Sequence, residues 1–119
     1  MKRLILAAWL AAAAAPAWAA GDASRGEALF AQCAACHRPA GEANAIGPNL
    51  KGVVGRKAAS AEDFTYSPPL RRSGITWTDD KLDAFLADPQ AVAPGTKMPF
   101  AGVASPADRA DIIAYLKTQ

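Results

Sequence analysis

Two cysteines and one histidine stand together in the stretch Cys33-Ala-Ala-Cys36-His37, and the chain has no other residue of either type. A pair of thiols three positions apart, followed directly by an imidazole, is typical of the site where a c-type haem is attached. Each sulfur would form a thioether with one haem vinyl group, and the histidine would reach the iron as its proximal ligand. The motif therefore predicts one covalently bound haem c.

Two other uses of this motif compete with the haem. A dithiol oxidoreductase also has a Cys-x-x-Cys pair, but the thioredoxin kind needs alternating strands and helices, and the sequence has no convincing strand pattern. A structural zinc site needs four nitrogen or sulfur ligands, and this chain offers three side chains of that kind. A periplasmic dithiol oxidoreductase that uses Cys33 and Cys36 stays open as an alternative function.

The first 19 residues have the character of a secretory signal peptide. The basic start at residues 1–3 precedes an apolar run, and the small-residue pattern at residues 17–19 suits cleavage. The apolar run is shorter than the roughly 20 residues that span a bilayer. We expect residues 1–19 to be removed on export, and residues 20–119 to form one monohaem domain in the periplasm.

The exported domain is balanced in side-chain charge. Two of the 13 Lys and Arg residues belong to the leader, and the remaining ones equal the 11 Asp and Glu residues in number. The chain has no cluster of basic residues with interleaved aromatics, so a nucleic-acid partner is not expected.

Capping residues and proline predict an all-α domain with long irregular loops. Residues 38–60, rich in Gly, Pro and Asn, are expected to be loop. Gly26, inside the first helix, is expected where another backbone packs closely. The expected helices are one capped by Asp22 or Ser24 and running to about Gln32, one that starts at Ser67-Pro68-Pro69 and ends at Gly74, one that opens at Thr78 and is stopped by Pro89, and one that opens at Ser105-Pro106.

A single histidine leaves the sixth position of the iron open. Met98 is the one methionine that remains after the leader is removed, and it lies in a loop with proline on both sides, Pro94-Gly95-Thr96-Lys97-Met98-Pro99. Most methionines fill gaps in a core, but this loop has no helical apolar face around the residue. We therefore predict that His37 and Met98 are the two metal ligands, a pair that raises the reduction potential.

In this combination of motifs the chain resembles class I cytochrome c, a family of mitochondrial and bacterial periplasmic electron carriers. The resemblance spans nearly all of residues 21–118. It is carried, in order, by Cys33-Ala-Ala-Cys-His37, Gly47-Pro48-Asn49-Leu50, Gly55-Arg56-Lys57, Phe64-Thr65-Tyr66, Gly74-Ile75-Thr76-Trp77, Gly95-Thr96-Lys97-Met98, Phe100-Ala101-Gly102 and Ile113-Ala114-Tyr115-Leu116.

The resemblance implies a small fold whose helices wrap around the haem, and it assigns roles to further residues. The Pro48 carbonyl would accept the N–H of the second His37 nitrogen. Gly26 and Phe30 would meet the last helix where the two terminal helices cross. The residues that would donate hydrogen bonds to the haem propionates are Arg56, Tyr66, Trp77 and Thr96. The residues that would line the haem cavity are Leu50, Leu82, Phe85, Leu86, Phe100 and Leu116.

Three departures from the family pattern change what is expected. Phe85 stands where many members have a tyrosine near the methionine sulfur, which predicts a somewhat lower potential. Leu70 replaces an asparagine near buried water. Several lysines that surround the exposed haem edge in mitochondrial members are replaced, which predicts weak electrostatic steering toward a partner. The residues at those positions are Gln32, Gln90, Ala91, Ala104 and Ser105, while Lys97 remains.

The sequence thus predicts a soluble periplasmic carrier of single electrons, a monomer and not an enzyme, because two axial ligands leave no position for a substrate. Its expected partners are a quinol:cytochrome c reductase, a terminal oxidase, a photosynthetic centre or a periplasmic dehydrogenase. A haem-based sensor or peroxidase whose sixth position opens is a further alternative. Lys97, next to Met98, could displace the sulfur at high pH, or simply be a solvated surface lysine.

Overall fold

The structure is a computed structural model that describes residue 11 and residues 21–37 and 46–119. The predicted signal peptide, residues 1–19, lies outside the described residues except for Ala11, as does part of the loop expected over residues 38–60. None of the helices in the described ranges is long and apolar enough to cross a membrane.

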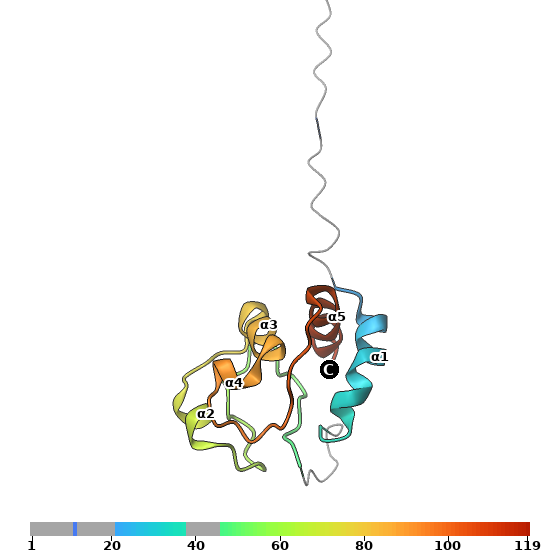
Figure 1. Ribbon diagram of the computed structural model, residues 1–119. Coiled ribbons are helices and arrows are strands. Elements are labelled where there is room, and N and C mark those ends of the chain that lie inside the picture. The colour runs from blue at the N-terminus through green and yellow to red at the C-terminus, as the bar shows by residue number, and fades with distance from the viewer. Residues whose placement is uncertain (1–10, 12–20, 38–45) are drawn as a thin grey trace, which may run out of the picture.

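The described ranges fold into helices joined by irregular segments, so the all-α prediction is confirmed (Figure 1). The one β contact among these residues is an isolated antiparallel bridge between Lys57 and Thr76. The helices are α1 (Ala23–Ala34), α2 (Pro68–Arg72), α3 (Asp79–Ala87), α4 (Pro89–Val92) and α5 (Pro106–Leu116).

Side-chain caps set the helix starts, as the sequence predicted. The Asp22 carboxylate accepts the backbone N–H groups of Ser24 at 2.9 Å and Arg25 at 3.2 Å. Thr78 caps α3 and Ser105 caps α5 in the same way. Each cap satisfies N–H groups that have no partner within their own helix. The C-terminal ends of the helices agree less closely with the prediction, since α1 continues two residues past Gln32.

The sequence does not predict helix α4, because Pro89 is expected there only as the end of the third helix. The Asp88 N–H donates to the Ala84 carbonyl at 3.1 Å and closes α3. The Asp88 side chain accepts the Ala91 N–H at 3.2 Å and opens α4. Proline is well suited to the first position of a helix, because its φ angle is already helical and its missing N–H is not needed there. Pro89 therefore separates two helices.

The apolar sides of α3 and α5 meet in the core. Leu82 and Leu86 of α3 are buried, as are Ile112, Ile113 and Leu116 of α5. These positions are spaced so that they share one face of each helix. The other buried side chains come from α2, in the case of Leu70, and from the irregular segments, which explains why loops of this length belong to the core. They are Val53, Tyr66, Leu70, Trp77, Ala93 and Val103.

Helices α1 and α5 lie side by side (Figure 1) and touch at Gly26. A Cβ atom at Gly26 would overlap the Asp111 carbonyl oxygen and would lie 2.8 Å from the Tyr115 Cβ. One turn further along α1, the Phe30 and Tyr115 rings pack with their centroids 5.2 Å apart. The prediction that Gly26 allows another backbone to approach is confirmed, and the neighbour is the last helix.

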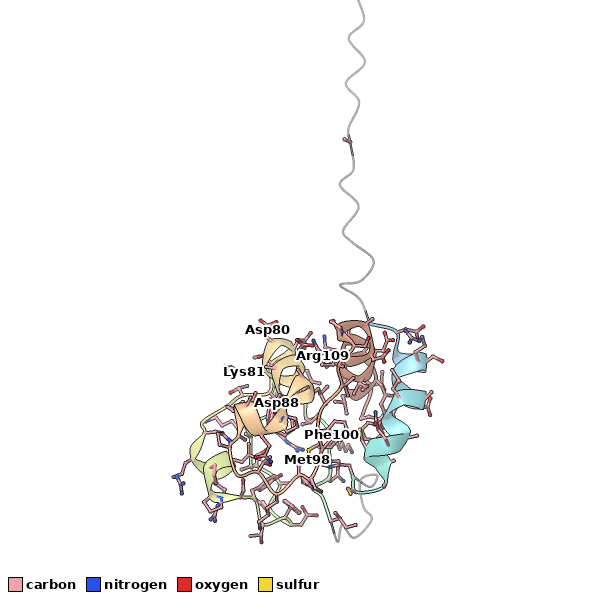
Figure 2. All side chains as sticks on the ribbon, viewed as in Figure 1. Asp80, Lys81, Asp88, Met98, Phe100 and Arg109 are labelled. Atoms are coloured by element: carbon pink, nitrogen blue, oxygen red, sulfur yellow. The ribbon has the colours of Figure 1, made fainter. Side chains whose placement is uncertain are left out.

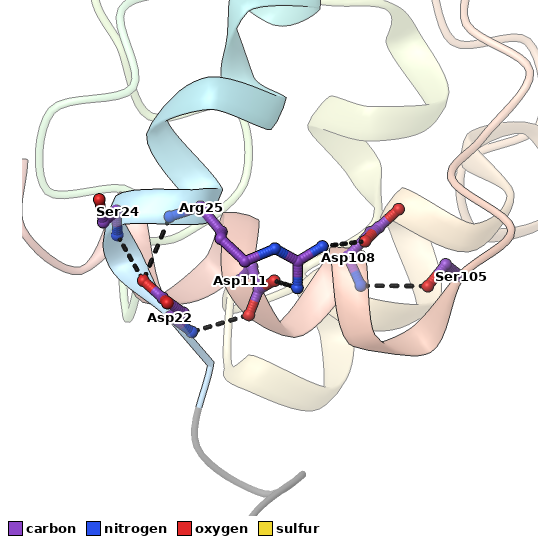
Figure 3. A network of polar contacts seen from close by, with 6 residues as sticks. All are labelled: Asp22, Ser24, Arg25, Ser105, Asp108 and Asp111. Carbon is purple, nitrogen blue, oxygen red and sulfur yellow. Dashed lines mark hydrogen bonds and ion pairs between the residues drawn. The ribbon is translucent and has the colours of Figure 1, made fainter.

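A polar network fixes the start of α1 to α5 (Figure 3). The buried Asp111 carboxylate accepts the Asp22 backbone N–H at 2.7 Å and the Arg25 guanidinium at 2.6 Å. Arg25 also pairs with Asp108 at 3.2 Å. A carboxylate this deeply buried needs such partners, because an unpaired charge would be costly there. The network therefore sets how far α1 can slide along α5.

We predict that Gly26→Ala lowers the free energy of unfolding by about 2–3 kcal/mol, because the added methyl group overlaps backbone that cannot move away. The measurement is the urea midpoint of the haem-loaded protein, at unchanged slope. Gly74→Ala is the matched control, since Gly74 has a φ of 65° but open space around it. In this control the free energy of unfolding should fall by only about 1–2 kcal/mol, because of backbone strain alone. A smaller loss in Gly26→Ala than in the control would contradict the close approach.

Ala59 is the one described non-glycine residue with a positive φ angle, 60°. An L-residue in this region is strained by roughly 1–2 kcal/mol, of which the larger unfolded-state entropy of glycine offsets about 0.5–1 kcal/mol. We predict that Ala59→Gly raises the free energy of unfolding by about 0.5–1 kcal/mol in the same urea assay. Ala58→Gly, at the neighbouring position without a positive φ, should lower it by a similar amount. Equal effects of the two changes would rule out strain at Ala59.

Candidate functional site

A cavity of about 230 Å³ lies among α1, α3, α5 and the segments that connect them. A single buried water needs only about 10–15 Å³ of such space, so the cavity can hold a much larger group. Its walls are mainly apolar, and the six apolar liners expected from the sequence, Leu50, Leu82, Phe85, Leu86, Phe100 and Leu116, all border it. So do the nine predicted site residues, Cys33, Cys36, His37, Pro48, Arg56, Tyr66, Trp77, Thr96 and Met98.

The end of α1 brings two thiols and an imidazole to one wall of this cavity. The chain keeps turning after the helix, because the N–H groups of Cys36 and His37 donate to the Cys33 carbonyl at 3.0 and 2.9 Å. Both cysteines are free thiols and half-buried. Burial, and to a smaller extent the nearby Cys36, raises the pKa of the Cys33 thiol.

The second nitrogen of His37 is held by the backbone. Its Nδ1 lies 2.7 Å from the Pro48 carbonyl oxygen, so Nδ1 carries the proton and Nε2 keeps a free lone pair. Burial lowers the pKa of His37, and the hydrogen bond to Pro48 opposes this to a smaller extent. A neutral imidazole with one free nitrogen is the form that binds a metal.

Gly47 makes room for the His37 ring. A Cβ at Gly47 would lie 3.0 Å from His37 Cε1 and 3.1 Å from the Cys36 carbonyl oxygen. The Gly47 N–H donates to that same carbonyl at 3.1 Å. In the sequence, Gly47 is recognisable only as part of the family motif Gly47-Pro48-Asn49-Leu50. The structure gives it a steric role beside the imidazole.

Met98 reaches the cavity from the segment between α4 and α5, where Figure 2 labels it together with Phe100. Hydrogen bonds hold this segment on both sides of the methionine. The Lys97 ammonium donates to the Thr65 carbonyl at 3.1 Å, and the Phe100 N–H donates to the Met98 carbonyl at 2.9 Å. The thioether is therefore placed by its neighbours in the chain.

Arg56 has a polar atom without a partner. Its two terminal nitrogens donate to the carbonyls of Lys51 and Asn49 at 2.9 and 3.1 Å. Its Nε is buried, and no partner for it is found in the part of the chain that the structure describes. A buried donor left unsatisfied costs free energy. Because Arg56 borders the cavity, an acceptor bound there would satisfy it.

Tyr66 and Trp77 are buried side chains with polar ends on the cavity wall. The Tyr66 hydroxyl accepts the Ala61 N–H at 3.1 Å, so its own proton is free to donate. The Trp77 ring packs edge-on against Phe85, with centroids 5.0 Å apart. The roles predicted for these two residues and for Thr96 toward the haem propionates stay predictions.

Ser67 borders the cavity, although the sequence predicts it only as the start of a helix. Its side chain is buried, borders the cavity and accepts the Leu70 N–H at a long 3.4 Å. A helix cap already explains a serine before Pro68-Pro69, so the cap gave no reason to expect Ser67 at the cavity. The sequence signal for that position was its neighbour Tyr66, which was predicted to face the haem.

The residues that meet at the cavity fit a haem c. Two thiols are available for the vinyl groups, a neutral imidazole and a thioether for the iron, and a guanidinium with a free donor for a propionate. The apolar walls suit the flat face of the porphyrin.

Comparison with known proteins agrees with this fit. The family model described as Cytochrome c matches residues 23–119. The chain belongs to the cytochrome c family. Cytochromes c carry one covalently bound haem c and transport electrons, and Cys33 and Cys36 have the spacing of the attachment motif. The resemblance to class I cytochrome c is therefore confirmed.

Individual cytochromes c cover most of the chain. Cytochrome c2 of Rhodomicrobium vannielii is 49% identical over 106 residues, which are 88% of this chain and 85% of that protein. Cytochrome c of Tetrahymena pyriformis is 52% identical over 82% of this chain and 89% of its own length. The solved structure of cytochrome cH from Methylobacterium extorquens has 51% identity and a TM-score of 0.78, and the match covers 83% of this chain and all of that one.

We predict that Arg56→Leu lowers the midpoint potential of the haem, because a nearby positive charge disfavours the ferric state. The expected fall is on the order of tens of millivolts. A spectroscopic redox titration measures it. Arg56→Lys is the control: it keeps the charge and should move the potential by less than half as much. An unchanged potential in Arg56→Leu would show that the guanidinium does not face the haem.

Proposed function

We propose that this cytochrome c is a periplasmic carrier of single electrons whose haem iron is bound by His37 and Met98. The observation that carries the proposal is that both side chains border one cavity, although they come from distant parts of the chain. His37 follows α1, and Met98 lies in the segment between α4 and α5. A nitrogen and a thioether ligand together favour ferrous iron and raise the potential.

When bound, the haem supplies the one-electron chemistry, and the chain supplies attachment, orientation and shielding. Cys33 and Cys36 hold the cofactor, and Pro48 fixes the tautomer of His37 through its carbonyl. The segment around Met98 is held through Lys97 and Thr65. Buried apolar walls such as Leu82 and Leu86 keep water away from the iron.

The absence of an enzymatic activity belongs to the same proposal. With His37 and Met98 both bound to the iron, no position would be left on it for a substrate. A haem-based sensor or peroxidase would instead need an open sixth position. The cavity favours the carrier, because the Met98 side chain is already at its wall and its segment is fixed by hydrogen bonds.

A dithiol oxidoreductase is disfavoured by the surroundings of Cys33. Reactive Cys-x-x-Cys pairs have a lowered thiol pKa and usually lie at the start of a helix, where the helix dipole stabilises the thiolate. Here Cys33 lies at the end of α1, and burial raises its pKa. Both effects make the thiolate less stable, so this pair suits thioether formation better than disulfide exchange.

The periplasmic location is inferred from the sequence of residues 1–19 and from bacterial relatives named cytochrome c2. The remaining residues, 20–119, are the proposed monohaem domain. In that compartment the partners would be membrane redox complexes, such as a quinol:cytochrome c reductase, a terminal oxidase or a photosynthetic centre, or a periplasmic dehydrogenase.

We predict that Met98→Ala changes the visible spectrum of the ferric protein and lets the reduced protein bind carbon monoxide, which the unmodified protein should not bind. The midpoint potential should fall by on the order of 0.1 V, within the ~0.8 V that axial ligands span. Absorption spectroscopy with and without carbon monoxide, and a redox titration, are the measurements.

Haem staining on a denaturing gel is the control for this experiment, and both proteins should stain because the thioether bonds do not involve Met98. If the unmodified protein does not stain for haem on the gel, the dithiol oxidoreductase is favoured. Stained, unmodified protein that binds carbon monoxide would favour the sensor or peroxidase and remove Met98 from the ligand set.

A further inference from the structure

The segment that carries Met98 begins with a tight turn. The Thr96 N–H donates to the Ala93 carbonyl at 2.9 Å and closes a turn of four residues. Pro94 is at its second position and Gly95, with a φ of 79°, is at its third, which is the pattern of a type II turn. The hydrogen bond of the turn uses neither the Gly95 N–H nor the Thr96 carbonyl, so both groups need another partner.

The side chain of Gln90, on α4, binds both of these groups. The Gly95 N–H donates to Gln90 Oε1 at 3.1 Å, and Gln90 Nε2 donates to the Thr96 carbonyl at 3.4 Å. A primary amide can bind an N–H and a carbonyl at once, because its oxygen accepts and its nitrogen donates. The lysine that mitochondrial members have at this position can only donate, so it could not accept the Gly95 N–H.

Gln90 is exposed, but the helix that carries it is anchored. Its neighbour Pro89 is fully buried, and Ala93, which follows α4, is 2% exposed. Among the described residues outside 93–100, only Gln90 and Thr65 hydrogen-bond to the segment 94–99. Gln90 is therefore one of two side supports for this segment, and the one that binds its backbone.

We propose that Gln90 is a positioning residue that keeps the Met98 thioether at the haem iron. The inference rests on the proposed function, in which Met98 is the sixth ligand. The turn that Gln90 holds is joined to the methionine directly, since the Thr96 hydroxyl accepts the Met98 N–H at 3.4 Å. For the sulfur to move away from the cavity wall, this segment has to shift, and the two bonds of Gln90 oppose that shift.

The test is the binding of imidazole to the ferric, haem-loaded protein, followed by its visible spectrum. Added imidazole takes the sixth position only in molecules whose Met98 has left it, so its apparent affinity reports the fraction of such molecules. Gln90→Met removes both hydrogen bonds and keeps the length of the side chain. We expect it to bind imidazole about fivefold more tightly than the unmodified protein, since two exposed hydrogen bonds of modest strength are lost.

Gln90→Glu is the conservative variant. Its carboxylate still accepts the Gly95 N–H but cannot donate to the Thr96 carbonyl. Its imidazole affinity should therefore lie between those of the unmodified protein and Gln90→Met. Gln32→Met is the matched control: Gln32 is also an exposed glutamine at the cavity, but it lies on α1. Its imidazole affinity should equal that of the unmodified protein.

Two further measurements separate positioning from general stability. Amide hydrogen exchange of the reduced protein should be faster at Gly95 in Gln90→Met, because that N–H has lost its acceptor. The urea midpoint should be the same in Gln90→Met and Gln32→Met, because both positions are exposed. A urea midpoint that falls in Gln90→Met alone would show general destabilisation and would overturn the inference.

Met98→Ala separates failure of this inference from failure of the proposed function. If it binds imidazole no more tightly than the unmodified protein, Met98 is not a ligand and the proposed function is wrong. If it binds imidazole far more tightly while Gln90→Met equals the unmodified protein, Met98 remains the ligand and the role of Gln90 is overturned. An equal gain in Gln32→Met and Gln90→Met would overturn that role too.

Discussion

An apolar cavity at the centre of a short chain is the constraint on which the rest of the structure depends. The direct packing between helices in the described ranges involves α1 with α5 and α3 with α5 and α4. Other segments contribute to the centre of the protein as walls of the cavity. Examples are α2, through Leu70, and the segment around Met98. Their positions relative to the helices are therefore set by the group that fills this space, and the buried Arg56 Nε indicates that this group has an acceptor at its edge.

The two sides of the cavity are built by different means. One side is helical: the end of α1 presents Cys33, Cys36 and His37 because hydrogen bonds continue its turn, and α5 supports α1 through the contact at Gly26. The other side is irregular backbone, held by single hydrogen bonds such as that from Lys97 to Thr65. Packed helices thus lie behind the covalent attachment, and irregular backbone lies behind Met98.

The sequence predicted the features that depend on neighbours in the chain. The caps Asp22, Thr78 and Ser105 are short-range hydrogen bonds, and the all-α class followed from them. Helix α4 was missed because a proline that ends one helix can also begin the next. The buried position of Ser67 and the free Nε of Arg56 depend on the cavity that distant segments form together, which hydrophobic periodicity along the sequence does not describe. The positive φ of Ala59 has no signal in the sequence either. The meeting of the nine predicted site residues at one cavity was expected from the family resemblance, since loops carry no pattern of their own.

The hydrogen bond from the Asp22 N–H to Asp111 joins residues 89 positions apart, so about three quarters of the 119-residue chain lies between the two partners. Bringing such distant segments together costs loop entropy and delays their meeting during folding. Because synthesis runs from the N-terminus, α1 emerges first and α5 last. The face of α1 around Gly26 therefore lacks its α5 contacts until α5 has been made. A chain that stops before α5 lacks Asp111 and Tyr115, the two residues that lie against Gly26 in this structure.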